Sequence, residues 1–140
     1  MFHNELEDID RLENDWIYFI GKNVPSSKNS KMWTGKILIK NRLSREYEDF
    51  LLTLLLKEKR RWQYLRKGLD DPLEIEFYFF RDSKRLFDYI NVLQIIADLL
   101  QKAGWLDDDD AAHFIPIFTG YEVTDKKNSG FKLRIINNKN

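Results

Sequence analysis

The chain has 140 residues, 43% of them hydrophobic and 14% aromatic, and its 23 basic and 23 acidic side chains give a formal net charge of +0. This composition suits one domain with a packed core and argues against a disordered chain. Cysteine is absent, which excludes disulfides, thiolate catalysis and cysteine-based zinc sites and suits a reducing cytoplasm. We recognise no signal peptide and no apolar run long enough for a bilayer, so we expect a cytoplasmic protein without a membrane partner.

The N-terminal part begins with an acidic, weakly periodic segment, residues 1–14, which we expect to be an arm outside the domain. Residues 16–20 are aromatic and β-branched and predict a first strand. The turn-forming segment 21–31 is either a plain surface loop or a set of donors for a phosphate backbone. The candidate donors are Ser27, Lys28, Asn29 and Lys31. A hairpin is predicted over residues 32–40.

A long amphipathic helix is predicted to begin at Ser44, a suitable N-cap, and its apolar positions continue as far as Leu65. The C-terminal part of this helix, residues 57–67, is strongly basic. Cations at a helix end complement the macrodipole and can simply face solvent. They can equally neutralise DNA phosphates while an aromatic ring stacks on bases. The residues concerned are the cations Lys59, Arg60 and Arg61 and the rings of Trp62 or Tyr64.

Further strands are predicted over residues 73–80, 114–118 and 131–136. Pro116 requires the second of these to be an edge strand or to carry a bulge, because proline has no N–H for the ladder. The polar segments between elements hold further candidate DNA-binding cations: Lys84, Arg85, Lys126 and Lys127. The predicted fold class is α+β, a small mixed β-sheet packed against two main helices in one domain over residues 15–137, with a tail at 138–140.

The stretch from Phe87 to Asp110 is the most informative part of the chain. Its apolar residues recur at helical spacing and predict a helix that starts at Asp88, an N-cap, and stops at Gly104. Four adjacent aspartates, 107–110, follow, and such a turn can simply face solvent. We expect instead that the loop folds back beside the helix start and that the carboxylates together hold a divalent metal. Mg²⁺ and Mn²⁺ prefer such oxygen ligands.

Across residues 16–136 the chain resembles the RusA family of Holliday-junction resolvases. The resemblance consists of a loop after a strand, the two ends of the central helix and a final turn and strand; its residues are Pro25-Ser26-Ser27-Lys28-Asn29, Asp88, Asn91, Asp98, Leu99, Gly104, Asp108, Asp109 and Gly130. At the helix start the family pattern is similar to Asp-x-Asp-Asn-x-x-Lys, and this chain reads Asp-Tyr-Ile-Asn-Val-Leu-Gln. Ile90 and Gln94 therefore stand where the family has an aspartate and a lysine.

The resemblance implies a Mg²⁺- or Mn²⁺-dependent endonuclease that works as a homodimer on four-way DNA junctions, in a bacterium or encoded by a phage or prophage. By matching position the catalytic residues would be Asp88, Asn91, Asp108 and Asp109, and the three aspartates would bind the metal. Because Ile90 and Gln94 differ from the family pattern, the alternative of a branched-DNA-binding protein that has lost its catalytic activity stays open. A third interpretation is an interaction domain whose acidic loop binds a basic protein. The isolated histidines, His3 and His113, are assigned no role.

Overall fold

A computed structural model describes residues 15–26, 31–33, 38–40 and 42–137 of the chain. The predicted arm at 1–14 and tail at 138–140 lie outside the described residues. The elements are β1 (Ile17–Ile20), β2 (Lys31–Trp33), β3 (Leu38–Lys40), α2 (Arg42–Lys57), α3 (Lys59–Arg66), β4 (Leu73–Arg81), α4 (Tyr89–Lys102), β5 (Phe114–Val123), the 3₁₀ helix η2 (Lys126–Asn128) and β6 (Gly130–Ile135). The predicted α+β class is confirmed.

The main sheet has four strands in the order β1-β6-β4-β5. β6 runs antiparallel to both of its neighbours, whereas β4 and β5 are parallel, so the sheet is mixed as predicted. β5 is an edge strand, as Pro116 requires, and its register shifts opposite Phe77 and Tyr78. It continues to Val123, beyond the predicted end at Phe118, because its pairing with β4 skips Thr119 at the register shift and resumes where Gly120 pairs with Tyr78.

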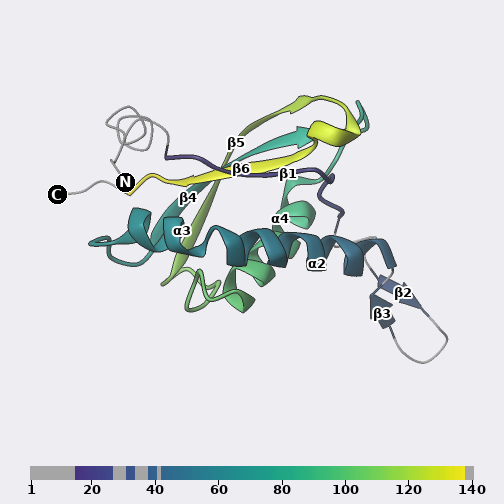
Figure 1. Cartoon of the computed structure of the whole chain (residues 1–140). Coiled ribbons are helices and arrows are strands. Elements are labelled where there is room, and N and C mark those ends of the chain that lie inside the picture. Colours follow the sequence, from purple (N-terminus) through teal and green to yellow (C-terminus); the bar gives the residue numbers. More distant parts are fainter. Residues whose placement is uncertain (1–14, 27–30, 34–37, 41, 138–140) are drawn as a thin grey trace, which may run out of the picture.

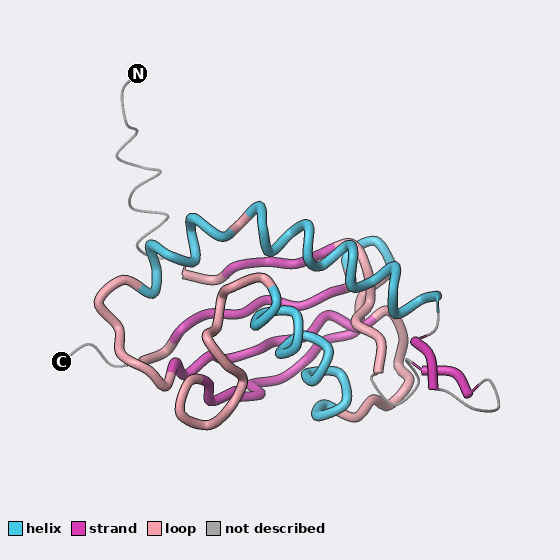
Figure 2. Tube along the Cα trace, turned by 90° about the horizontal axis from the view of Figure 1, so that it is seen from below, coloured by secondary structure: helices cyan, strands magenta, loops and turns pink. Residues whose placement is uncertain are grey.

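The helices α2, α3 and α4 cover one face of the sheet (Figures 1 and 2). The burial pattern of β4 explains why, since Leu73, Ile75, Phe77 and Phe79 are all fully buried while Tyr78 and Phe80 are only half-buried. The helix α4 adds its own apolar stripe to the same core. A single hydrophobic layer between sheet and helices is the main source of stability for such a fold.

The long basic helix differs from its prediction in two ways. It begins at Arg42, and Ser44 is buried inside the first turn instead of capping it. It is also interrupted at Glu58, which separates α2 from α3. Backbone bonds still cross the interruption, from the Glu58 N–H to Leu54 and from the Trp62 N–H to the Glu58 carbonyl. The two helices therefore continue along nearly one path (Figure 1).

Two tryptophans join α3 to the chain that follows α4. The rings of Trp62 and Trp105 stack with their centroids 4.7 Å apart, and both residues are at most 1% exposed. Trp62 Nε1 donates to the Trp105 carbonyl at 3.0 Å, and Trp105 Nε1 donates to the Leu55 carbonyl at 3.0 Å. Trp62 is therefore a core residue and cannot stack on a nucleic-acid base.

The predicted hairpin is present as the separate two-stranded sheet β2–β3, in which Met32 pairs with Ile39. It stands apart from the four-stranded sheet, beyond the N-terminal end of α2 (Figure 1).

Among the described residues, no helix is both long enough and apolar enough to cross a membrane.

A candidate phosphate-binding cleft and the acidic loop

The start of α4 is formed by the residues that the sequence assigned to it. Asp88 is the N-cap, and its Oδ1 accepts from the Ile90 backbone N–H at 3.1 Å. Its Oδ2 accepts from the Asn91 side-chain amide at 3.1 Å. The capping bond holds the carboxylate at the positive end of the helix dipole, where a negative charge is favoured. Asp88 and Asn91 therefore form one fixed polar unit at the mouth of a cleft.

This cleft, with a volume of about 570 Å³, lies where the loop after β1 meets the ends of α2, β4 and α4. Its walls are the loop before residue 27, the first turn of α2, the segment that leaves β4 and the first turn of α4. The lining residues are Asn23, Val24, Pro25, Ser26, Leu43, Ser44, Arg81, Asp82, Ser83, Arg85, Leu86, Phe87, Asp88 and Asn91. Two distant parts of the RusA-like pattern, Pro25-Ser26 and Asp88 with Asn91, thus share one cleft.

Arg81 at the end of β4 fastens the loop to the sheet. Its Nη1 donates to the Val24 carbonyl at 2.8 Å, and its guanidinium lies 4.3 Å from the centre of the Phe87 ring. The next residue, Asp82, donates its backbone N–H to Asn23 Oδ1 at 3.3 Å. Burial lowers the pKa of Arg81 from its ordinary value, and the Asp82 carboxylate opposes this shift. Arg81 is not among the candidate residues that the sequence pattern indicates.

The cleft contains both signs of charge, with the cations Arg81 and Arg85 and the carboxylates Asp82 and Asp88. A planar guanidinium can bind two phosphate oxygens at once, which suits a phosphodiester. Carboxylates next to such a ligand are tolerated when a cation lies between them and the phosphate. This combination of groups fits a bound phosphodiester, either alone or with a hard divalent ion.

The acidic loop lies at the opposite end of α4. The chain leaves β4 at Arg81 and enters β5 at Phe114, but the parallel register pairs Phe114 with Leu73, the first residue of β4. A connection between parallel strands must carry the chain back to the end of the sheet from which the first strand began. The 14 residues of α4 do this over roughly 20 Å at about 1.5 Å per residue.

The expectation that this loop folds back beside the helix start is therefore wrong. Within one chain, Asp88 does not share a single ion with Asp108 and Asp109, because the helix separates them. The sequence pattern identified the two ends of the helix correctly but could not show that the following loop stays at the far end. Trp105 and Leu106 are buried, and the contacts of Trp105 with α2 and α3 hold the loop at this end.

At that far end the loop makes contacts that the sequence did not indicate. Asp71, Asp107 and His113 each offer a donor atom, and these atoms lie within 4.8 Å of one another. His113 Nδ1 lies 2.7 Å from Asp110 Oδ1. This hydrogen bond raises the pKa of His113 above its ordinary 6.5 and lowers the pKa of Asp110. Because Asp71 comes from the turn before β4 and the other two residues come from the loop after α4, no spacing in the sequence could have revealed the group.

Inside the loop, Asp108 Oδ1 accepts from the Asp109 backbone N–H at 2.7 Å. Asp109 is exposed and Asp108 half-buried, and neither lines the cleft at the start of α4. That Asp108 and Asp109 bind a metal remains a prediction. Any such metal would lie at the other end of α4 from Asp88.

The predicted DNA-binding residues fall on different surfaces. Ser27, Lys28 and Asn29 lie outside the described residues, and Lys31 is in β2. The segments that follow β4 and β5 carry four exposed cations: Lys84, Arg85, Lys126 and Lys127. The Thr124 N–H donates to the Arg81 carbonyl at 2.7 Å, which joins the ends of these two strands. Both segments therefore lie at the end of the sheet that carries the cleft. Lys59, Arg60 and Arg61 are in α3, where Lys59 Nζ lies over Gly104.

No protein-family model matches the sequence, and no curated protein matches it either. The likeness to RusA therefore depends on the residues quoted in the sequence analysis.

Proposed function

We propose that the protein binds branched DNA, and that the cleft at the start of α4 grips its phosphodiester backbone. The observation that supports this most directly is the meeting of Pro25-Ser26 with Asp88 and Asn91, which are about sixty residues apart in the chain, around the half-buried cation Arg81. The choice of four-way junctions as the ligand, and of a homodimer as the binding unit, comes from the resemblance to RusA. A two-fold dimer suits a junction of near two-fold symmetry.

The cleft residues have distinct roles in this proposal. Arg81 and Arg85 contact phosphate oxygens, and Ser26 supplies a hydroxyl donor. The bond from Asn91 to Asp88 fixes the orientation of its amide, which leaves the amide oxygen and the second N–H for a ligand. The exposed cations Lys84, Lys126 and Lys127 extend the positive surface along the same end of the sheet.

A second candidate function is Mg²⁺- or Mn²⁺-dependent cleavage of the junction. It is favoured by the presence of two carboxylates, Asp82 and Asp88, in the same cleft as the phosphate-binding cations. A hard ion bound there would polarise a phosphoryl group and supply hydroxide from bound water. At the position of the family's second aspartate the chain has Ile90, whose side chain is 72% exposed and offers no ligand. Binding is for this reason the first proposal and cleavage the second.

The test compares a synthetic four-way junction with a linear duplex of the same arm sequences. Fluorescence anisotropy at increasing salt should show tighter, salt-sensitive binding of the junction without added metal. Equal affinity for junction and duplex at low salt would contradict the proposal.

Cleavage is then measured with Mg²⁺ and Mn²⁺ for the wild type, Asp88→Asn and Asp109→Asn. Activity that is lost in Asp88→Asn and retained in Asp109→Asn supports the second candidate at this cleft. Activity that survives in Asp88→Asn rules out chemistry at the cleft. Binding without any cleavage leaves the first proposal alone, and activity gained by the double change Ile90→Asp and Gln94→Lys would then identify the missing groups.

A further inference from the structure

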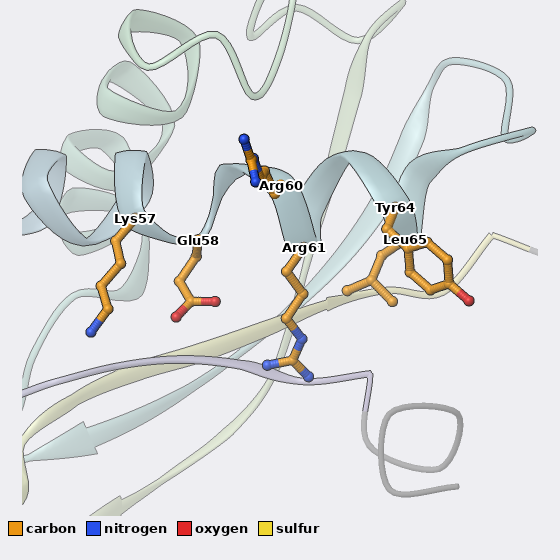
Figure 3. Close-up of a pocket in the computed structure, with 6 residues that line it drawn as sticks. All are labelled: Lys57, Glu58, Arg60, Arg61, Tyr64 and Leu65. Carbon is orange, nitrogen blue, oxygen red and sulfur yellow. The ribbon is translucent and has the colours of Figure 1, made fainter. Parts of the chain in front are cut away.

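A second hollow of about 440 Å³ lies along α3, at the other end of α2 from the cleft. Its volume is within the range of small-ligand pockets, roughly 300–1,000 Å³. It is lined by Lys57, Glu58, Arg60, Arg61, Tyr64 and Leu65. All but Arg60 point to one side of the helix, toward the side on which β1 runs, and Arg60 points the other way (Figure 3). We call this hollow the α3 groove.

The α3 groove combines positive charge with an accessible aromatic ring. Lys57 and Arg61 are four residues apart and project on the same side, so their charges flank one strip of surface (Figure 3). Tyr64 is 65% exposed at the end of this strip, whereas Trp62 of the same helix is 1% exposed. Cations that follow a backbone and a ring on which a base can stack are the two features that single-stranded nucleic acids require.

A carboxylate lies between the two cations. Glu58 projects beside Lys57 and Arg61 on the same side of the helix (Figure 3). A carboxylate repels phosphate oxygens, but it accepts hydrogen bonds from an exocyclic amino group such as N4 of cytosine. Its position among cations suits a ligand that carries both a phosphate and an amino-bearing base.

We propose that the α3 groove binds an unpaired nucleotide of single-stranded DNA. Tyr64 stacks on the base, Lys57 and Arg61 contact the phosphates on either side, and Glu58 accepts from an exocyclic amino group. The inference extends the proposed DNA-binding function to a second surface, and the two surfaces are tested separately. An unpaired nucleotide near a branch point would be its natural occupant.

The experiment measures binding of a short oligo-dC and an oligo-dT to the full chain by fluorescence anisotropy, at low and moderate salt. Tyr64→Ala should weaken oligo-dC binding roughly 5- to 150-fold, the range that corresponds to loss of stacking on one base. Tyr64→Phe keeps the ring and should retain most of the affinity. The wild type should prefer oligo-dC to oligo-dT, and Glu58→Gln should reduce that preference, because thymine has no exocyclic amino group.

The matched control is Tyr18→Ala, which removes another exposed tyrosine, 46% exposed, from β1. Circular dichroism confirms that each variant is folded. Equal oligo-dC affinity in the wild type and in Tyr64→Ala overturns the inference, as does an equal loss in Tyr18→Ala.

Arg81→Gln distinguishes this inference from the proposed function. If the wild type binds junctions and Arg81→Gln does not, while no oligonucleotide binds, the α3 groove is refuted and the cleft stands. If oligo-dC binding depends on Tyr64 but junction binding is unaffected by Arg81→Gln, the groove stands and the cleft is refuted.

Discussion

Replacing Arg81 with glutamine tests the cleft most directly. The side chain becomes two bonds shorter and loses both its charge and the planar set of guanidinium N–H donors. In the structure Arg81 donates one hydrogen bond to the Val24 carbonyl at 2.8 Å and packs against Phe87. It also lines the cleft beside Asp82. The change would therefore remove the phosphate contact that we propose for Arg81, and it would also loosen the loop that carries Ser26.

The expected loss of DNA affinity follows from this half-buried position. A hydrogen bond to a charged partner contributes about 1.5–3 kcal/mol. Solvent on one side of the guanidinium screens the interaction, so we take about 1–2 kcal/mol, or roughly 5- to 30-fold in Kd. Loss of one phosphate contact should also make the plot of log binding constant against log salt concentration less steep, with the magnitude of its negative slope smaller by about 0.9.

The assay is junction binding by anisotropy across a salt series, with a charge-matched control at the other end of α4. Lys102→Gln removes an exposed cation from the last turn of that helix, far from the cleft, and should change affinity less than twofold. Arg81→Lys keeps the charge but not the planar fork and should fall between wild type and Arg81→Gln. If Arg81→Gln and Lys102→Gln have the same affinity and the same salt slope, the reasoning is refuted.

Three further changes test other parts of the structure. Trp105→Ala removes a fully buried indole and should lower the free energy of unfolding by about 3–5 kcal/mol, measured by urea denaturation. Gly130→Ala places a Cβ 2.0 Å from the Phe19 carbonyl oxygen at a φ of +144°, so it should cost about 3 kcal/mol or more by the same measurement. Asp110→Asn should bring the pKa of His113 down toward its ordinary 6.5, measured by NMR titration of the imidazole.

Each of these has its own control. Trp105→Phe keeps an aromatic ring and should cost less than Trp105→Ala. Gly68 also has a positive φ, +80°, but a Cβ there meets nothing within 4 Å. Gly68→Ala should therefore cost only about 1 kcal/mol, and equal losses at the two glycines would show that the clash with Phe19 is not the cause.

The pH dependence of the His113–Asp110 pair has a definite sign. The pKa of His113 is raised in the folded state, so its contribution is fully present below about 6.5 and is lost as pH rises through the folded pKa. The pKa of Asp110 is lowered, so its contribution is present above about 3.8 and is lost as pH falls through the folded pKa. Asp110→Asn should reduce the dependence near neutral pH, because it removes the largest cause of the raised pKa of His113 while Asp71 and Asp108 remain. An unchanged His113 titration in that variant would contradict the pairing.

Several features of the fold were accessible from local sequence signals. The period of α4, its cap at Asp88 and its stop at Gly104 agree with one another, because each depends on a few neighbouring residues. The alternation in β4 and the missing N–H of Pro116 likewise placed a half-buried strand and an edge strand. The start of α2 was misplaced, because Ser44 is a good cap in isolation but is needed in the core.

The candidate site was only partly predictable. Asp88 and Asn91 were identified, and their mutual hydrogen bond follows from a spacing of three residues on a helix. Arg81 was missed, because its hydrogen-bond partner Val24 is 57 residues away and only folding brings the two together. Trp62 and Tyr64 were equal candidates for stacking until packing against Trp105 placed one in the core and left the other exposed.

The sequence by itself determined the α+β class, the central helix with its two polar ends and the presence of cations that could meet DNA. Tertiary structure decided which of those groups can act together. Periodicity and capping are properties of neighbouring residues, and they hold whatever the rest of the chain does. The distance between Asp88 and the acidic loop depends instead on β4 and β5 being parallel, which forces a rigid helix to carry the chain from one end of the sheet to the other.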